Sequence, residues 1–281
     1  MKRILGRILG RHRQERISQT LCKMIDITIS LVSFNQRHDL EQLLPSLLQA
    51  TSQIRAEILL IDNRSTDKTY EFVRHNYPMV EIFKNLNKAG YGKNHNINLK
   101  RARGRYFVIM NSDMLVSQDV FSSLLDFMEK HEKIGIISPK ILNEDGTIQG
   151  LNKRYPTLLD LFLRRFCTKS FQKYFKKRLD YYEMRDIGYD HIYDVPFLSG
   201  SFMFHRTNLL KSIGGFDPGF FLYFEDADLC RRVQRTHRTV YYPYVSIYHF
   251  WKRAAHNNLI YTLYFIRSSA RYFRKWGFRL Y

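Results

Sequence analysis

The segment Tyr106-Phe107-Val108-Ile109-Met110-Asn111-Ser112-Asp113 joins five apolar residues to three polar ones. A short apolar run of this kind predicts a strand buried on both faces. Outward from it, strands are predicted at 25–34, 57–61 and 80–83, and helices at 39–49, 66–75 and 92–102. This alternation predicts an α/β fold with a mostly parallel central sheet and helices on both faces.

Polar clusters follow three of these strands. Ser33 and Asn35 end the first strand, Asp62 and Asn63 follow the second, and the third is Asn111-Ser112-Asp113. Ligands bind parallel sheets outside the carboxyl ends of the strands, so these side chains are candidates for one binding site.

The glycine patterns exclude two nucleotide-binding classes. No Gly-x-Gly-x-x-Gly follows the first strand, and no Gly-x-x-x-x-Gly-Lys-Ser/Thr occurs, so the dinucleotide fingerprint and the P-loop are both absent. Gly90-Tyr91-Gly92 instead precedes a predicted helix. Glycine lets a backbone approach a phosphate closely, and a helix N-terminus attracts one. We expect a phosphate-binding loop here, with an ordinary loop as the alternative.

A second polar cluster lies far along the chain. Gly214-Gly215-Phe216-Asp217 predicts a turn, and the aromatic run at 220–224 leads to Glu225, Asp226 and Asp228. The helical pattern that begins there places these acids at a helix N-terminus, which stabilises negative charge. Acids in a first helical turn are often only solvated. Because these follow an apolar run, a carboxylate acting as a general base is the alternative that we favour.

The second half of the chain departs from regular alternation. Its predicted elements are a helix at 118–130, strands at 135–141, 195–205, 239–242 and 246–250, and a closing helix at 257–276. His249 lies near the end of the last strand. Residues 153–192 interrupt the pattern and predict an inserted pair of basic, aromatic-rich helices, either as a cover for the core or as a face for an anionic or lipid-linked acceptor.

The composition bounds the class of protein. The 281 residues are 44% hydrophobic, and 45 Lys and Arg against 26 acids give a net charge of +19, which implies an anionic partner. Three scattered cysteines show no metal or disulfide spacing, which is typical of a reducing compartment. No apolar run is long enough to span a membrane and no standard signal peptide is present, so we expect a cytoplasmic protein.

Three basic segments are amphipathic: the tail at 1–24, the insertion at 153–192 and the closing segment at 253–281. An anionic membrane surface would bind such segments through cations and aromatic side chains. This predicts a peripheral protein on the inner face of the membrane, with the aromatic residues of the closing helix, including Trp276, at headgroup depth. The alternatives are a frayed tail and a closing helix whose aromatic residues, including Trp276, pack on the core.

Taken together, several motifs in order resemble glycosyltransferase family 2, and within it the rhamnosyltransferase-like branch. The resemblance covers about residues 25–252. It rests on Ile61–Asp67, on the glycine loop from Asn87 to Asn96, on Asn111-Ser112-Asp113 as a degenerate Asp-x-Asp, on Gly200, on Gly214–Asp217 and on Glu225–Leu229. The sequence departs from the family at Asn94, where glycine is common, in the spacing at Lys88-Ala89, and at Pro218.

The resemblance implies a GT-A fold with one catalytic domain at 25–252, divided into a nucleotide-sugar half (25–115) and an acceptor half (116–252). It implies a divalent metal, Mn²⁺ or Mg²⁺, held by Asp113 and His249, although a core histidine is the alternative for His249. Asp226 would deprotonate the acceptor in an inverting displacement, while Glu225 or Asp228 orients it or caps the helix. The residues implied to bind the donor are Ser33, Asn35, Asp62, Asn63, Gly90, Tyr91, Gly92, Asn96, Asn111 and Ser112.

The resemblance also implies the partners. They are a nucleotide-sugar donor, dTDP-rhamnose or a UDP-sugar, and a saccharide or lipid-linked acceptor in cell-surface polysaccharide synthesis. The membrane spans and the Gln-x-x-Arg-Trp motif of processive members are absent, which favours transfer of a single sugar.

Three other readings compete. The charge fits a nucleic-acid-binding protein, but acid clusters at strand ends have no role there, so we expect no nucleic-acid partner. A nucleotidyltransferase would carry a glycine-rich basic signature after the first strand, where Leu31–Asn35 has none. A catalytically lapsed relative would not be expected to keep Asp113, Asp226 and His249.

Overall fold

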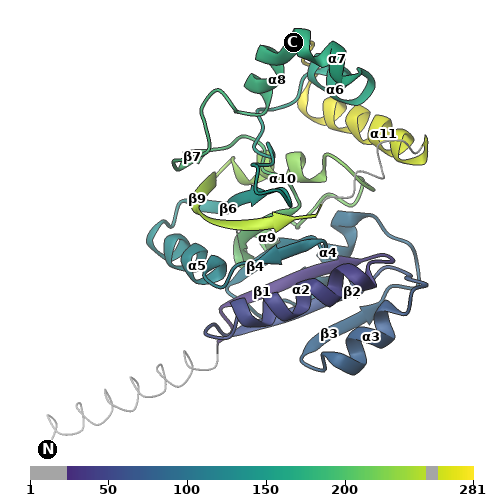
Figure 1. Ribbon diagram of the computed structural model, residues 1–281, viewed down its shortest axis with the longest axis vertical. Coiled ribbons are helices and arrows are strands. Elements are labelled where there is room, and N and C mark those ends of the chain that lie inside the picture. Colours follow the sequence, from purple (N-terminus) through teal and green to yellow (C-terminus); the bar gives the residue numbers. More distant parts are fainter. Residues whose placement is uncertain (1–23, 251–258) are drawn as a thin grey trace, which may run out of the picture.

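The computed structural model describes residues 24–250 and 259–281. The strands of these residues form one nine-stranded sheet with the order β3-β2-β1-β4-β8-β6-β9-β5, and β7 pairs with β9 (Figure 1). The strands are β1 (Ile27–Ser33), β2 (Ala56–Asp62), β3 (Val80–Lys84), β4 (Tyr106–Met110), β5 (Met114–Val116), β6 (Ile134–Leu142), β7 (Tyr193–Asp194), β8 (Phe202–Arg206) and β9 (Arg238–His249).

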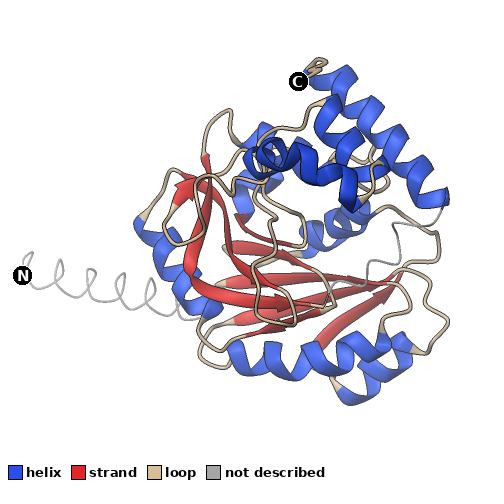
Figure 2. Ribbon diagram, turned by 45° about the horizontal axis from the view of Figure 1, so that its top comes forward, coloured by secondary structure: helices blue, strands red, loops and turns tan. Residues whose placement is uncertain are grey.

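Helices cover both faces of this sheet (Figure 2). They are α2 (Arg37–Ala50), α3 (Thr69–Asn76), α4 (Tyr91–Arg101), α5 (Val120–Lys130), α6 (Leu158–Phe166), α7 (Lys169–Gln172), the 3₁₀ turn η1 (Lys173–Phe175), α8 (Lys176–Tyr182), α9 (Thr207–Ser212), α10 (Glu225–Val233) and α11 (Leu259–Trp276). The predicted α/β fold is therefore confirmed.

The sheet has a parallel half and a mixed half. β3, β2, β1 and β4 are parallel neighbours. β8 then pairs antiparallel with both β4 and β6, whereas β6 and β9 are parallel. The carboxyl ends of the first strands thus meet at one edge, as the sequence predicted, and the second half brings other segments to that edge.

The core follows the two-residue period of the strands. Ile27, Ile29 and Leu31 of β1 pack in the larger apolar cluster with α2, α3 and α5. A second cluster on the opposite face contains residues of α4, α9 and α10. β1, β2 and β4 are buried on both faces, whereas β3 at the edge of the sheet is partly exposed. β4 is accordingly a continuous apolar run, while β1 alternates apolar residues with small polar ones.

Several element predictions are wrong in detail. Residues 195–201 are not part of the strand predicted at 195–205, which begins only at Phe202. This stretch contains Pro196 and Gly200, and it forms a loop whose backbone contacts Asp226. The two strands predicted at 239–242 and 246–250 are one strand, β9, whose register on β6 shifts between Pro139 and Lys140. β5, β7 and α9 were not predicted.

A third apolar cluster joins the insertion to the closing helix. Leu161 of α6 packs with Phe224, Tyr272 and Phe273 in this cluster. Thr157 and Asp160 start α6 with a reciprocal capping box. The insertion and α11 therefore form one layer over the edge of the sheet, at the top of Figure 1.

Two predicted segments lie wholly or partly outside the described residues. The basic tail at 1–24 is described only at Met24, and the closing segment at 253–281 is described from Leu259. The division of residues 25–252 into two halves stays a prediction.

Candidate active site

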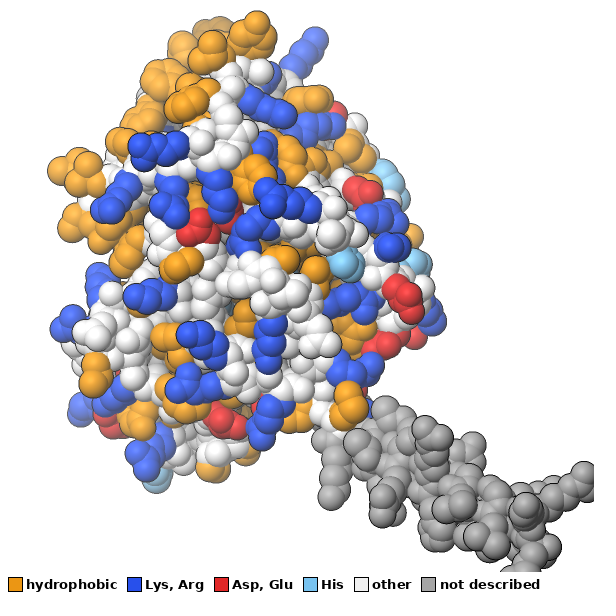
Figure 3. All heavy atoms as spheres, turned by 180° about the vertical axis from the view of Figure 1, so that it is seen from behind, with side chains coloured by type: hydrophobic (Ala, Val, Ile, Leu, Met, Phe, Trp, Pro, Cys, Tyr) orange, Lys and Arg blue, Asp and Glu red, His pale blue; other side chains and the backbone are white. Residues whose placement is uncertain are grey.

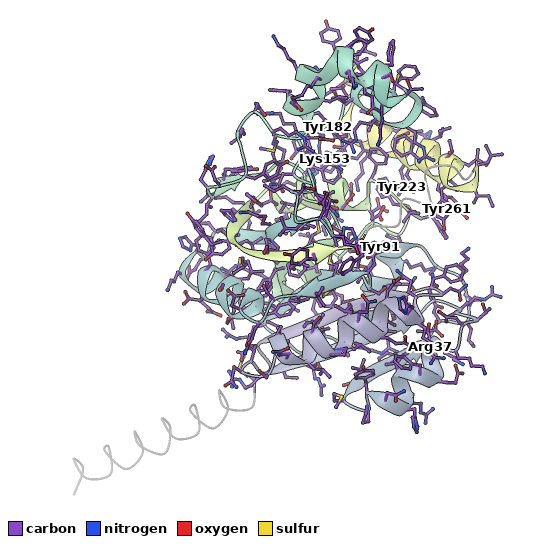
Figure 4. The ribbon with its side chains drawn as sticks, viewed as in Figure 1. Arg37, Tyr91, Lys153, Tyr182, Tyr223 and Tyr261 are labelled. Carbon is purple, nitrogen blue, oxygen red and sulfur yellow. The ribbon has the colours of Figure 1, made fainter. Side chains whose placement is uncertain are left out.

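Two cavities meet at the carboxyl edge of the parallel strands. The strand-end cavity has a volume of about 410 Å³ and is lined by residues that follow β1, β2 and β4. The carboxylate cavity has a volume of about 390 Å³ and is lined by Glu225 and Asp226 together with part of the insertion. Tyr91, Asn111 and Leu222 line both cavities. In Figure 4, Tyr91 lies below Lys153 and Tyr223 of the carboxylate cavity.

Four of the predicted donor-binding residues line the strand-end cavity: Asn63, Tyr91, Asn111 and Ser112. The Asn63 side chain exchanges hydrogen bonds with the backbone of Ala89, at 3.0 and 3.2 Å, which holds the glycine loop against the end of β2. The opposite wall was not predicted, because it comes from Phe221 and from Ile260, Tyr261 and Tyr264 of α11.

Three residues predicted to bind the sugar donor do not line the cavity, and two of them, Asn35 and Asp62, shape the neighbouring loop. The Asn35 carboxamide accepts a 2.7 Å hydrogen bond from the Thr66 N–H, and Asp62 Oδ1 accepts one of 2.9 Å from the Ser65 N–H. The Ser33 hydroxyl is buried and has no partner within the described residues. These contacts fix the backbone at 63–68, and direct donor binding by these three residues stays a prediction.

The glycine loop and Asn96 contact the segment that precedes the acids. A Cβ on Gly90 would lie 2.3 Å from the Phe221 oxygen, and one on Gly92 would lie 2.6 Å from Phe216 Cβ. The Asn96 carboxamide donates to the Phe216 oxygen and accepts from its N–H, both at 2.8 Å. The glycines therefore allow close packing of residues 216–221, and binding of the sugar donor by Gly90, Gly92 and Asn96 stays a prediction.

Asp113 and His249 lie together because β5 pairs with β9. Their side chains are largely buried, and Asp113 Oδ1 lies 3.3 Å from His249 Nε2. The Gln149 carboxamide donates from Nε2 to the His249 backbone oxygen at 2.8 Å, so its Oε1 faces His249 Nδ1 at 2.9 Å. Because the Gln149 oxygen can only accept a hydrogen bond, His249 Nδ1 must carry the proton. Nε2 of the neutral ring then has a lone pair.

This arrangement fits a metal ion. Asp113 Oδ1 has no hydrogen-bond partner among the described residues although it is buried. The Asn111 amide nitrogen lies 3.4 Å from Nε2, which is a weak contact, so a carboxylate oxygen and an imidazole lone pair still face each other. A cation between them would relieve their repulsion. Within 24–250 and 259–281, no group of three or more His, Cys, Asp or Glu could hold a metal alone. The remaining ligands would come from a substrate or from water.

Glu225 and Asp226 start α10 from an unusual backbone. Tyr223 and Phe224 both have positive φ, 72° and 64°. This region is unfavourable for residues with large side chains and is found mainly where the surrounding packing enforces it. Here the Tyr223 and Phe224 rings both pack on Phe265 of α11, at 5.9 and 5.4 Å between ring centroids. The closing helix thus helps to aim the two acids.

The two acids differ in their surroundings. Burial raises the pKa of Asp226, while the Gly200 N–H, donating to Oδ2 at 2.9 Å, and the Lys153 charge oppose the rise. Burial also raises the pKa of Glu225, as does the Asp226 charge, and Glu225 Oε2 has no hydrogen-bond partner among the described residues. Negative charge is therefore more favourable on Asp226, and Glu225 is the acid that keeps its proton.

Asp228 does not join them. Its carboxylate is fully buried away from both cavities and accepts from Arg232 at 2.8 Å, from Lys275 at 2.6 Å and from the Trp276 indole at 2.9 Å. The structure does not support the catalytic alternative for Asp228. Its acceptor sites are taken up in holding the end of α11 on α10.

Several residues of the site were missed by the sequence analysis. Gln149 lies in an irregular segment without a motif, and no local pattern marks it. Lys153, Arg164 and Arg165 belong to the basic insertion, which was predicted only as a segment. Tyr261 and Tyr264 belong to the closing helix, where the sequence predicted a membrane contact instead.

Comparison with known proteins identifies the class to which this site belongs. The model of the family "Glycosyl transferase family 2" matches residues 28–228, which include all three strand-end clusters and the acids of α10. The chain belongs to glycosyltransferase family 2. It is therefore a glycosyltransferase, as the motifs indicated.

Two curated relatives are rhamnosyltransferases. The N-acetylglucosaminyl-diphospho-decaprenol L-rhamnosyltransferase of Mycobacterium tuberculosis is 26% identical over 241 residues, which cover 79% of this chain and 75% of the relative. Rhamnosyltransferase WbbL of Escherichia coli is 25% identical over 180 residues, which cover 60% of this chain and 62% of WbbL. The rhamnosyltransferase-like resemblance is thus confirmed.

A solved structure supports the fold. The mannosyltransferase PcManGT from Pyrobaculum calidifontis, in complex with GDP-Man and Mn²⁺, superposes with a TM-score of 0.60 at 16% identity and covers 89% of this chain and 65% of its own. The GT-A fold is confirmed. In the part of the chain that the structure describes, no helix has the length and apolar character needed to cross a membrane.

Proposed function

We propose that the enzyme is a metal-dependent, inverting transferase that moves one sugar from dTDP-rhamnose or a UDP-sugar to a saccharide or lipid-linked acceptor in cell-surface polysaccharide synthesis. The observation that carries the proposal is the junction of the two cavities at Tyr91 and Asn111. A donor in the strand-end cavity and an acceptor beside Asp226 would meet there, which is the geometry that a direct transfer needs.

The carboxylate cavity supports a single displacement. In this step the acceptor hydroxyl oxygen forms a bond to the anomeric carbon as the bond to the nucleoside diphosphate breaks. Asp226 takes the hydroxyl proton, and the diphosphate leaves with the bonding electron pair. Attack from the side opposite the leaving group inverts the anomeric carbon. Glu225, protonated and neutral, adds no second charge to repel the ionised Asp226.

The metal assignment rests on the Asp113–His249 pair. Asp113 Oδ1 and His249 Nε2 would hold Mn²⁺ or Mg²⁺, with the Gln149 carboxamide fixing the ring. When bound, the ion would neutralise the negative charge of the diphosphate. A histidine ligand favours Mn²⁺ over Mg²⁺, and the mannosyltransferase with a similar fold was crystallised with Mn²⁺.

The relatives support the donor and the pathway. The names of two of them specify rhamnose transfer, and one specifies a diphospho-lipid acceptor. A relative named as a minor teichoic acid biosynthesis protein and one named as a poly(ribitol-phosphate) beta-N-acetylglucosaminyltransferase also match part of the chain. We therefore favour dTDP-rhamnose among the possible donors.

We also propose that the enzyme works on an anionic membrane surface, on its cytoplasmic side. Figure 3 shows hydrophobic side chains gathered at the end of the molecule formed by the insertion and α11, with lysine and arginine side chains beside them. We call this the apolar surface, defined by the exposed residues Phe162, Phe166, Phe171, Tyr174, Leu259, Leu263 and Ile266. An interfacial membrane contact needs both properties.

The residue expected at headgroup depth requires a correction. Trp276 donates its indole N–H to buried Asp228 at 2.9 Å, and Tyr272 and Phe273 are buried. These aromatic residues of the last helix are used in packing, so the membrane proposal rests on the apolar surface instead.

The test is calorimetric titration of dTDP and UDP, with Mn²⁺ or with chelator. We expect tight binding only with metal, and we expect Asp113→Ala to remove the difference. Equal affinity in chelator would contradict the metal assignment. Failure of dTDP-rhamnose and of UDP-sugars to act as donors would contradict the proposed donors.

A further inference from the structure

Lys153 lies in the carboxylate cavity at a position fixed by the backbone. Its N–H donates to the Phe197 oxygen at 3.0 Å and its own oxygen accepts from the Phe197 N–H at 2.9 Å, which forms an isolated β-bridge. The ammonium lies 5.1 Å from the centre of the Phe197 ring. The same cavity is lined by Asp226 and Glu225, and Figure 4 shows Lys153 beside Tyr182 above Tyr91.

The other cations around this cavity are already engaged. Arg164 pairs with Glu183, and Arg165 donates to the Thr262 hydroxyl at 2.6 Å. The adjacent Arg154, which does not line the cavity, holds both oxygens of Asp186. Within 24–250 and 259–281, the Lys153 ammonium has neither a hydrogen bond nor an ion pair. Lys153 is thus the cation of this cavity whose hydrogen-bond donors are available to a ligand.

The Asp226 carboxylate does not accept a hydrogen bond from the Lys153 ammonium. The two charges attract each other, since each shifts the pKa of the other, but no ion pair joins them. Burial, followed by the Arg164 charge, lowers the pKa of Lys153 to about 8, so the protonated form still predominates at neutral pH. Lys153 is half-buried, and an ammonium that is partly removed from water and has no counter-ion is stabilised when an anion enters.

We propose that Lys153 binds a phosphate group of the acceptor, so that the sugar hydroxyl reaches Asp226 while the phosphate lies against the ammonium. This inference rests on the proposed function and specifies its acceptor as a phosphate-bearing saccharide. The charge balance permits it because Glu225 is protonated and Glu183 is paired with Arg164. Hydrogen bonds from an ammonium to phosphate are among the stronger ones in proteins.

The walls of the cavity indicate where the rest of such an acceptor would go. Leu161, Phe197 and Phe265 give it an apolar lining, and Phe162 and Phe166 of the same helix α6 belong to the apolar surface. A chain attached to the phosphate would leave the cavity along α6. The phosphate itself could belong to a lipid carrier or to a lipid-free saccharide, and the experiment separates these sources.

The experiment compares three acceptor probes with the donor that the wild-type enzyme uses. The first is N-acetylglucosamine joined through a diphosphate to an octyl chain, the second is the octyl glycoside without phosphate, and the third is N-acetylglucosamine 1-phosphate. Each is assayed with wild type, Lys153→Met, Lys153→Arg and the control Lys130→Met. Lys130 is exposed and pairs with Asp126, so this control removes the same charge far from the cavity.

We expect Lys153→Met to lower kcat/KM for both phosphate-bearing probes by roughly 10–100-fold, mainly through KM, as expected for a lost hydrogen bond to a charged group. Transfer to the octyl glycoside should fall much less, only by the share that the Lys153 charge contributes to keeping Asp226 ionised, and Lys153→Arg should restore part of the loss. Preference for the octyl diphosphate over the 1-phosphate would identify a lipid carrier as the source, and equal use would identify a lipid-free one.

Three results would overturn the inference. An equal loss with all probes would show that Lys153 acts only through Asp226. No loss would show a neutral acceptor, and an equal loss in Lys130→Met would show general attraction by the positive protein. If Lys153→Met does not fold, the same comparison is read from Lys153→Arg and from wild-type discrimination among the probes. Absence of transfer by wild type to any probe would instead count against the proposed function.

Discussion

The strand-end cavity and the carboxylate cavity are similar in volume and share three residues, yet they are built differently. The strand-end cavity is formed largely by short polar segments that follow β1, β2 and β4. The carboxylate cavity is assembled from the insertion, the loop at 197–201, α10, His249 and α11. The first is thus set by the topology of a parallel sheet, and the second by packing of segments distant in sequence. Variants in the strand-end cavity should therefore change binding of the sugar donor, whereas variants in the carboxylate cavity should change transfer.

The largest effect is expected for Asp226→Asn. The change keeps the shape and an oxygen that can accept from the Gly200 N–H, but it removes the base, so turnover should fall by roughly 10²–10⁴-fold. Affinity for the nucleoside diphosphate should not change, because that ligand belongs to the other cavity. Single-turnover assays and calorimetry would measure the two quantities.

Asp228→Asn is the matched control in the same helical turn. It weakens the contacts to Arg232 and Lys275, so the melting temperature should fall while transfer per folded molecule is retained. If Asp228→Asn loses as much transfer as Asp226→Asn does, the assignment of Asp226 as the base is wrong.

A smaller effect is expected for Gln149→Leu, which tests the proposed metal site at the junction of the two cavities. Without the carboxamide the His249 ring loses the contact that fixes its tautomer, and affinity for Mn²⁺ in the presence of nucleoside diphosphate should fall by roughly 10–100-fold. Electron paramagnetic resonance of free Mn²⁺ measures this without turnover. Unchanged Mn²⁺ affinity would mean that His249 is a core histidine rather than a ligand.

The double variant Phe162→Ser/Phe166→Ser tests whether the carboxylate cavity opens toward a membrane. Both rings are more than half exposed, so their loss should cost little stability but should lower binding to anionic vesicles by on the order of 10-fold. Co-sedimentation at low and high salt measures it. Trp276→Phe is the control and should bind vesicles like wild type. If the intact protein does not bind anionic vesicles at low salt, the membrane proposal is wrong.

The smallest effect is expected for Glu225→Gln, measured as stability. The folded pKa of Glu225 is raised above its ordinary value of 4.5, so between these two values the folded state binds more protons than the unfolded state. Wild-type stability should therefore fall as pH rises through this window. The variant lacks this titration, so its Tm relative to that of wild type should rise from pH 5 to pH 8. The rise should be roughly 2–4 °C for each kcal/mol of stability that wild type loses. A constant difference would show an unperturbed Glu225.

The sequence predicted the parallel half of the molecule well because its signals are local. The strand at 106–110 and the polar groups after β1, β2 and β4 follow from apolar runs and from sheet topology. The pairing of Asp113 with His249 was implied by resemblance, and the structure brings the two side chains together.

The parts that could not be predicted depend on tertiary contacts. Gln149 acts through two hydrogen bonds to a residue 100 positions away. The loop at 195–201 has apolar residues that favour a strand, but Gly200 is needed as a donor to Asp226. The sequence could not show whether the aromatic face of α11 contacts a membrane or the protein core, because either environment can bury such a face. Contacts with Asp217 and Asp228 determine the position of the helix.

The attachment of α11 also bears on how the enzyme is made. The segment that aims the acids is held by contacts from Ser268 to Leu222, from Arg271 to Asp217 and from Trp276 to Asp228. Translation of the roughly 50 residues between Asp226 and Trp276 takes about 3–10 s at ordinary rates. A nascent chain can therefore form the parallel half of its sheet while its catalytic acids are still unrestrained. Activity should appear only after α11 has left the ribosome.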